Sequence, residues 1–155
     1  MLDRFDREIL ACLQNDADIS LLELAKKVSL TKNPCWRRIQ KMQAAGIIKK
    51  RVALLDGQKI GLGVTVFVNI RTNQHTSEWL EAFAKIVHSI PEVVEFYRMS
   101  GDVDYTLKVV VPSMHAFDDV YKKLIGQIEV FDVSSQFAME EIKNTTALPL
   151  NYLNS

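Results

Sequence analysis

Apolar residues in the first part of the chain recur every three or four positions, the spacing of helices with one buried face. Asp3, Ser20 and Thr31 each precede one such stripe and suit the capping position of a helix. Ser20 and Glu23 also have the spacing of a capping box. The three stripes are Phe5, Ile9, Cys12 and Leu13, then Leu21, Leu24, Ala25 and Val28, then Cys35, Ile39 and Met42. The pattern predicts three short helices, the last closed by Gly46.

The second and third of these helices are separated by a short turn at residues 28–31. Two helices joined in this way and preceded by a packing helix are typical of a helix-turn-helix. Residues 47–55 then look like a short basic strand, and Asp56-Gly57 is a turn signal. We expect this strand to act as a wing.

From Val64 onward the apolar period changes between that of strands and that of helices. Strands are predicted at 64–71, 93–99, 105–111 and 133–142, helices at 76–89 and 113–125, and a short edge strand at 147–150. The order βαββαβ is that of a ferredoxin-like unit. The predicted fold class is therefore α+β, with a winged helix-turn-helix over 1–50, a linker and wing strand over 51–63, and a ferredoxin-like domain over 64–155.

The net charge is zero, but the charges are unevenly distributed. Residues 1–51 hold 11 Lys and Arg against 6 Asp and Glu, whereas the remainder is acidic in balance. The stretch between Glu23 and Asp56 contains nine basic residues and no acidic one. This asymmetry indicates an N-terminal part that binds a polyanion, although a basic patch facing solvent would give the same count.

The third predicted helix carries the candidate DNA contacts on the face opposite Cys35, Ile39 and Met42. Arg side chains can pair with guanine or phosphate, and amide side chains can pair with adenine. Trp36 is left with two interpretations, since it could instead pack against the first helix or the wing. The candidates for double-stranded DNA are Lys32, Asn33, Trp36, Arg37, Arg38, Gln40 and Lys41, and those for flanking phosphate contacts are Lys26, Lys27, Lys49, Lys50 and Arg51.

A second candidate site lies in the predicted hairpin turn that contains Gly101, Asp102 and Asp104. A glycine beside two carboxylates can bring backbone amides and acidic groups together, which suits the two charged ends of an amino acid. A Gly-Asp pair in a hairpin is also common as a turn without any ligand.

Other functional classes find little support in the residues. The three histidines are scattered without metal-ligand spacing, and neither a phosphate loop nor a nucleophile motif occurs. We therefore expect no catalytic site, metal or cofactor. Because the sequence has neither a long apolar run nor a secretion signal, a cytoplasmic protein without membrane contact is predicted. Two alternatives stay open: a thiol-based redox regulator using Cys12 and Cys35, and an amino-acid-binding regulatory subunit of a metabolic enzyme.

Taken together, five segments resemble the Lrp/AsnC, or feast/famine, family of transcriptional regulators. These segments are residues 2–10, 34–39, 46–48, 101–105 and 139–143. The resemblance implies a DNA-binding regulator that forms dimers, tetramers or octamers and binds a small effector, usually an amino acid, between dimers. The positions it assigns to the effector are Gly101, Asp102, Asp104, Tyr105, Met114, Gln136, Phe137 and Ala138.

Further segments resemble the subgroup of this family that activates cysteine-detoxification genes. They are residues 33–36, 53–56, 59–63, 77–79 and 134–140. Phe137-Ala138 stands where several members of the family have small β-branched residues, which argues against leucine as the effector. The subgroup resemblance adds cysteine as one candidate effector, and the sequence leaves the identity of the amino acid open.

Overall fold

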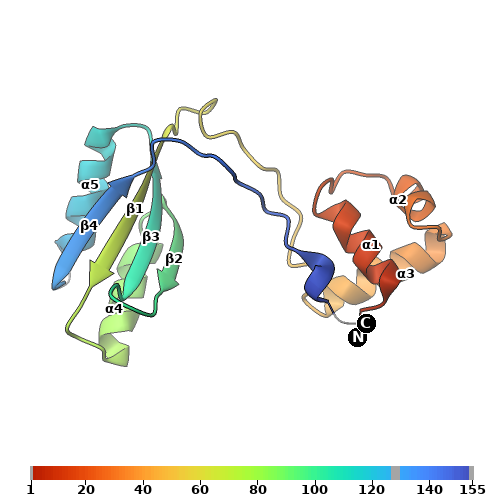
Figure 1. The fold of residues 1–155 in the computed structure, drawn as a ribbon, viewed down its shortest axis with the longest axis horizontal. Helices are drawn as coiled ribbons and strands as arrows, with labels where there is room; N and C mark the ends of the chain where they lie inside the picture. The colour runs from red at the N-terminus through yellow and green to blue at the C-terminus, as the bar shows by residue number, and fades with distance from the viewer. Residues whose placement is uncertain (1, 127–129, 154–155) are drawn as a thin grey trace. The chain divides into compact units, whose positions relative to one another are not determined.

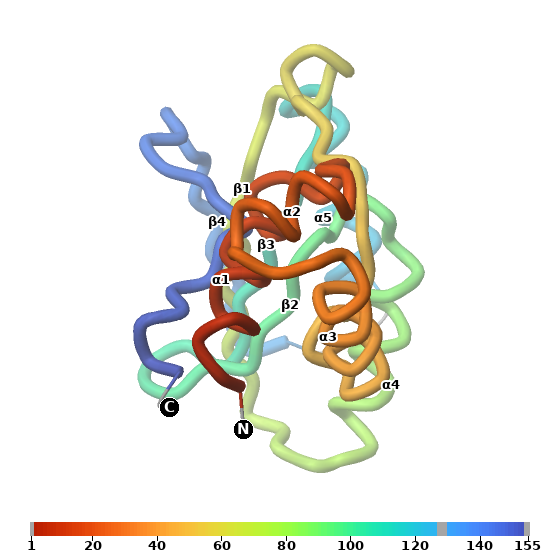
Figure 2. Tube along the Cα trace, turned by 90° about the vertical axis from the view of Figure 1, so that its right-hand side faces the viewer, coloured from red at the N-terminus to blue at the C-terminus, as the bar shows by residue number. Residues whose placement is uncertain are grey.

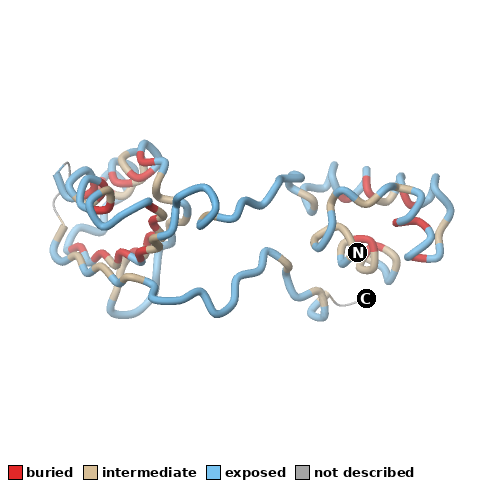
Figure 3. The backbone as a smooth tube through the Cα atoms, turned by 90° about the horizontal axis from the view of Figure 1, so that it is seen from above, coloured by how far each residue is buried: buried red, intermediate tan, exposed pale blue. Residues whose placement is uncertain are grey.

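The computed structural model describes residues 2–126 and 130–153. The chain divides into two compact units, which we call the helical unit and the sheet unit. Residues 1–54 and 143–155 form the helical unit, and residues 55–142 form the sheet unit. Buried positions gather inside each unit, whereas the connecting segments are exposed (Figure 3).

The helical unit contains α1 (Arg4–Leu13), α2 (Leu21–Lys27) and α3 (Lys32–Ala44), as the apolar spacing predicted. Both α1 and α2 begin with a complete capping box, made by Asp3 with Asp6 and by Ser20 with Glu23. The core of the unit consists of Ile9, Leu24, Ala25, Val28, Cys35, Ile39 and Met42. The three predicted stripes therefore meet in one hydrophobic cluster.

The two ends of α3 are built differently. At its start, Thr31 has the extended backbone of a capping residue, but its side chain makes no capping hydrogen bond to any described residue. After its end, Gly46 has a φ of +70°, and the Ile47 N–H donates to the Met42 carbonyl. The positive φ explains the glycine, because other residues rarely adopt it.

Two predicted strands are wrong. Residues 49–56, all of which are described, form no strand, and the wing strand is therefore missing from the single chain. Figure 2 traces this segment as the connection that follows α3. Residues 147–149 are also irregular and lead into a 3-10 helix, η1 (Leu150–Tyr152). An apolar segment forms a strand only where a neighbouring strand supplies hydrogen bonds, and neither segment has such a neighbour in the described chain.

The sheet unit contains β1 (Val64–Arg71), α4 (Ser77–His88), β2 (Val93–Arg98), β3 (Tyr105–Val111), α5 (Met114–Ile125) and β4 (Asp132–Phe137). The strands lie in the order β2-β3-β1-β4, and all neighbours are antiparallel (Figure 1). This is the ferredoxin-like arrangement that the order of elements predicted.

One face of the sheet is covered by α4 and α5 (Figure 1). Strand β3 alternates between buried and partly exposed positions, which places Tyr105, Leu107, Val109 and Val111 under the helices. Phe83 of α4 is fully buried there, with its ring centroid 5.1 Å from that of Trp79 and 5.9 Å from that of Tyr105. No helix among the described residues covers the opposite face.

Strand β4 is shorter than predicted and ends at Phe137 instead of Ile142. The Ala138 N–H donates to the carbonyl of Thr65, the second residue of β1, so only Val64 of that strand lies beyond this bond. Beyond this point Met139 is 96% exposed and Ile142 is 90% exposed. Met114, the first residue of α5, is also exposed.

The domain boundaries differ from the expectation at the C-terminal end. Residues 143–155 were expected in the ferredoxin-like domain, but their contacts assign them to the helical unit. The β4 pairing ends at Phe137 and the Ala138 N–H makes one more bond to β1, but no described residue beyond Ala138 takes part in the strand pairing.

Replacing Phe83 with Ala should destabilise the protein by about 3–5 kcal/mol, because a buried ring inside an aromatic cluster leaves a cavity. Phe131→Ala serves as the control, since this phenylalanine is exposed, and its cost should stay at about 1 kcal/mol or less. Urea unfolding followed by circular dichroism measures both. Equal losses would contradict the assigned core.

Candidate nucleic-acid interface and effector site

The outer face of α3 is open to solvent within the helical unit. Its buried positions, Cys35, Ile39 and Met42, fix the rotation of the helix, so the residues between them point outward. The predicted DNA contacts that are exposed on this face are Lys32, Asn33, Trp36, Arg37, Gln40 and Lys41. Asn33, Arg37 and Lys41 follow at intervals of four residues and therefore form one row. The row contains no acidic side chain and can approach a polyanion.

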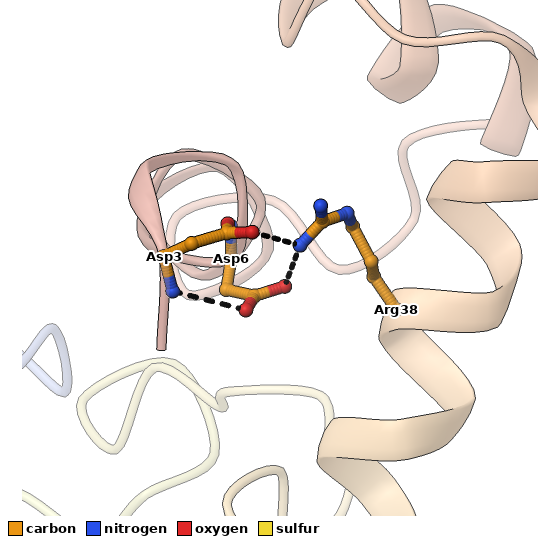
Figure 4. Close-up of polar contacts among 3 residues, drawn as sticks. All are labelled: Asp3, Asp6 and Arg38. Carbon is orange, nitrogen blue, oxygen red and sulfur yellow. Dashed lines mark hydrogen bonds and ion pairs between the residues drawn. The ribbon is translucent and has the colours of Figure 1, made fainter. Parts of the chain in front are cut away.

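Arg38 is turned away from this row and is bound to the start of α1 (Figure 4). Its Nη1 atom lies 2.6 Å from Oδ2 of Asp3 and 2.8 Å from Oδ1 of Asp6. The guanidinium group also lies 5.4 Å from the ring centroid of Phe5. Asp6 is a buried charged residue, and Arg38 supplies the cation that offsets the cost of burying its carboxylate.

The charges in this cluster stabilise one another. The backbone N–H of Asp6, and after it the Arg38 guanidinium, lower the pKa of the Asp3 carboxyl below its ordinary value. The hydrogen bonds from Arg38 to Asp6 and Asp3 raise the pKa of the guanidinium. The sequence pattern assigned Arg38 to the DNA face, and this assignment is corrected here: Arg38 joins α3 to α1 and positions the helix. Its neighbour Arg37 is the arginine that points outward.

Trp36 lies at the edge of a shallow groove between α3 and the other two helices. The groove has a volume of about 390 Å³ and is lined by Leu13, Ile19, Leu21, Leu24, Trp36, Ile39, Gln40, Gln43 and Arg51. Trp36 is nevertheless 52% exposed, so one part of the ring faces the groove while another faces solvent. Gln40 also borders this groove, and its Nε2 donates to Oε1 of Gln43.

The second candidate site is a depression in the sheet unit at the hairpin between β2 and β3. It has a volume of about 400 Å³ and is lined by Arg71, Thr72, Asn73, His75, Gly101, Asp102, Asp104 and Phe131. The hairpin turn requires Gly101, whose φ is +115°. Three of the predicted effector residues, Gly101, Asp102 and Asp104, are therefore brought together.

Asp104 anchors this depression. Its Oδ2 accepts a hydrogen bond from the Thr72 N–H at 2.8 Å, and its Oδ1 lies 3.9 Å from Nδ1 of His75. Its own N–H donates to the carbonyl of Ile70 at the end of β1. The hairpin is thus joined to the segment that follows β1, and carboxylates and cationic groups face the same space.

The other predicted effector residues do not line this depression. Tyr105 packs in the aromatic core, and Phe137 packs edge-on against Phe117. Neighbouring strand residues point to opposite faces, so Gln136 faces away from Phe137. Met114 and Ala138 are exposed elsewhere on the sheet unit.

Sequence analysis missed Arg71, His75 and Phe131 as lining residues. Arg71 and Phe131 are adjacent because β1 pairs with β4, and the guanidinium carbon of Arg71 lies 5.7 Å from the ring centroid of Phe131. The signal was indirect: the βαββαβ order places the end of β1 beside the start of β3, and residues 71–75 follow directly.

Comparison with known proteins identifies both units. Residues 65–148 match the family described as the Lrp/AsnC ligand binding domain, and residues 2–49 match a winged helix-turn-helix DNA-binding domain. The chain belongs to the Lrp/AsnC family. It is 53% identical to the glutamate uptake regulatory protein of Zymomonas mobilis over 96% of this chain and 91% of the relative.

Two solved structures of the family resemble the whole chain. An AsnC family transcriptional regulator from Agrobacterium tumefaciens has a TM-score of 0.95 and 59% identity, covering 98% of this chain and 99% of its own. A transcriptional regulator of Neisseria meningitidis in complex with L-methionine has a TM-score of 0.94 and 35% identity, covering 99% and 100%. The Lrp/AsnC chain described here is a DNA-binding transcriptional regulator with an amino-acid-binding type of domain, and not an enzyme.

One of the two cysteines of this Lrp/AsnC chain is poorly suited to redox chemistry. Cys35 is fully buried, and its burial raises the pKa of the thiol, which disfavours the reactive thiolate.

The described residues contain no cluster of His, Cys, Asp and Glu able to hold a metal ion. Nor does the described part of the chain include a helix that meets the length and apolarity needed to span a bilayer.

Replacing Arg38 with Met should destabilise the helical unit by about 1–3 kcal/mol at neutral pH, because the buried Asp6 carboxylate loses its cationic partner. Arg4→Met is the matched control, since Arg4 forms an exposed pair with Glu8 on α1 and should cost little. Thermal and urea unfolding of both variants measure the difference. An equal effect of the two substitutions would contradict the positioning role.

The same substitution should change how stability depends on pH. Because the pKa of Asp3 is lower in the folded than in the unfolded protein, its contribution is complete above the ordinary value of 3.8 and is lost as pH falls through the folded value. Arg38→Met removes one cause of that lowering. Urea midpoints between neutral and acidic pH should therefore fall less steeply in this variant; an unchanged pH profile would refute the assignment.

Proposed function

We propose that α3 reads DNA sequence in the major groove through the exposed row Asn33, Arg37 and Lys41, together with Trp36 and Gln40. The observation that carries this proposal is the burial of Cys35, Ile39 and Met42, which leaves this basic face uncovered in the helical unit. Residues near the start of a recognition helix reach the bases in helix-turn-helix complexes. Asn33 and Arg37 are therefore the candidates for base contacts.

Other basic residues of the helical unit position the protein on the phosphates. Lys26 and Lys27 end α2, and Lys49, Lys50 and Arg51 follow α3; all are exposed. Contacts with phosphate add affinity without reading sequence, and they make binding sensitive to salt. Lys32 and Lys41 extend the same positive surface along α3.

The depression at the hairpin is the proposed effector site. Asp102 supplies a carboxylate for an ammonium group, while the Arg71 guanidinium supplies a cation and the His75 imidazole a polar side chain for a carboxylate. An α-amino acid carries both groups, and Phe131 offers a surface for its side chain. L-methionine is bound by a structural relative, and L-cysteine is the effector that the subgroup resemblance implies.

The uncovered face of the sheet supports assembly of the chain into homo-oligomers, from dimers to tetramers or octamers. Phe67 and Tyr97 are large exposed aromatic residues on this face. Exposed aromatic side chains on a flat surface are typical of protein interfaces. An oligomer places several copies of α3 on one DNA molecule, so the second contact becomes intramolecular. We place this regulator in the cytoplasm, together with its DNA.

Replacing Arg37 with Ala should weaken binding to a preferred duplex, selected from a random library, by about 1–3 kcal/mol and should relax the base preference. Lys41→Ala should instead weaken binding to all duplexes alike and reduce the salt dependence. Lys85→Ala, on α4 of the sheet unit, is the control and should change neither. Gel shifts over a salt series measure all three. If Arg37→Ala binds as tightly as the unmodified protein, α3 is not the interface.

A free amino acid that occupies the depression should raise the melting temperature, because it binds only the native protein; a concentration 100 times its Kd adds about 2.7 kcal/mol. A thermal-shift screen of all common amino acids, L-cysteine and L-methionine included, identifies the ligand. Asp102→Asn should abolish the shift, whereas Asp119→Asn on the exposed side of α5 should preserve it. A shift that survives Asp102→Asn would place the effector elsewhere.

A further inference from the structure

The chain segment that ends at Leu153 belongs to the helical unit although β4 belongs to the sheet unit. Figure 1 shows η1 lying beside the helices of this unit. The contacts that hold it there are hydrogen bonds to α1, between residues that are far apart in sequence. Neither the apolar pattern nor the effector motif predicted them.

The side-chain amide of Gln14 binds the segment at Leu148 through two hydrogen bonds. Its Nε2 donates to the Leu148 carbonyl at 3.0 Å, and its Oε1 accepts from the Leu148 N–H at 2.9 Å. A side-chain amide has one donor group and one acceptor, so it can satisfy both polar groups of a backbone residue as a neighbouring strand would. The backbone of Gln14 is itself fixed at the end of α1, where its N–H donates to Leu10.

Arg7 binds the same segment at Leu153. Its Nη1 donates to the Leu153 carbonyl at 3.1 Å, a charge-assisted hydrogen bond. Arg7 and Gln14 lie seven residues apart, which places them on the same face of α1 two turns from each other. The segment between the two contacts contains Pro149 and η1. It therefore runs along one face of α1.

We propose that residues 147–153 act as a strap that is clamped on α1 by Gln14 and Arg7. The helix-turn-helix unit is then built from two separate pieces of chain and is tied to the sheet unit by two connections. The second connection begins at β4, directly after Phe131 of the effector depression, and ends on α1. The consequence for DNA binding rests on the proposed function. When the strap is released, α3 can occupy more positions, and the effective concentration for a second DNA contact falls.

Hydrogen exchange of the full-length protein tests the clamp without DNA or effector. Gln14→Leu keeps the size of the side chain but removes its donor and its acceptor, so the Leu148 amide should exchange about tenfold faster or more. Asn15→Ala is the matched control: the side-chain amide of Asn15 donates to the Ala11 carbonyl of α1, and its loss should leave the exchange rate of the Leu148 amide unchanged. If Leu148 is unprotected in the unmodified protein, or if both variants speed its exchange equally, the proposal is overturned.

A second pair of variants tests the other contact of the strap, between Arg7 and Leu153. Arg7→Ala should speed exchange across residues 150–153, whereas Arg4→Ala, whose arginine pairs only with Glu8 on the same helix, should not. Circular dichroism of all variants establishes that α1 is intact. If neither Gln14→Leu nor Arg7→Ala speeds exchange while DNA binding still depends on Arg37, the strap alone is overturned. A protected strap in a protein that does not bind DNA overturns the proposed function alone.

Discussion

The burial of one apolar stripe, Cys35, Ile39 and Met42, fixes how α3 is rotated, and the DNA-binding surface depends on that rotation. Apart from Arg38, every other residue of α3 is exposed, because the fixed period of the helix turns it away from the buried stripe. Arg38 adds a polar constraint at the border of the stripe, where it bonds Asp3 and Asp6 at the start of α1. Packing and a partly buried ion pair together decide which basic residues of α3 are available to a polyanion.

In the sheet unit, the two-residue alternation of the strands decides which side chains are buried. Alternation along β3 places Tyr105 under the helices, whereas the hairpin before it leaves Gly101, Asp102 and Asp104 at the end of the sheet. The hydrogen bond from Thr72 to Asp104 closes the base of the depression. The site is therefore assembled where two connections meet at one edge of a well-packed core, which is a common location for ligand sites.

Elements with strong periodicity were predictable from the sequence, because the three helical stripes and the alternating strands each have one favourable way to be buried. The positions of Arg38, Arg71 and Phe131 were not, since each depends on a partner that is distant in sequence: Asp3 and Asp6, the hairpin, and β4 beside β1. The wing strand and the edge strand at residues 147–150 failed for a related reason. Local alternation cannot reveal whether a pairing strand exists.

The central claim is that the outward face of α3 meets duplex DNA, and the two tryptophans of the chain offer a direct test. Trp36 lies on that face and is half-exposed, whereas Trp79 is buried in the core of the sheet unit. A titration of ¹⁵N-labelled protein with duplex DNA, followed by nuclear magnetic resonance, resolves their two indole signals. The account predicts that the Trp36 signal shifts as DNA is added while the Trp79 signal stays in place. A Trp36 signal that is unchanged at saturating DNA would contradict it.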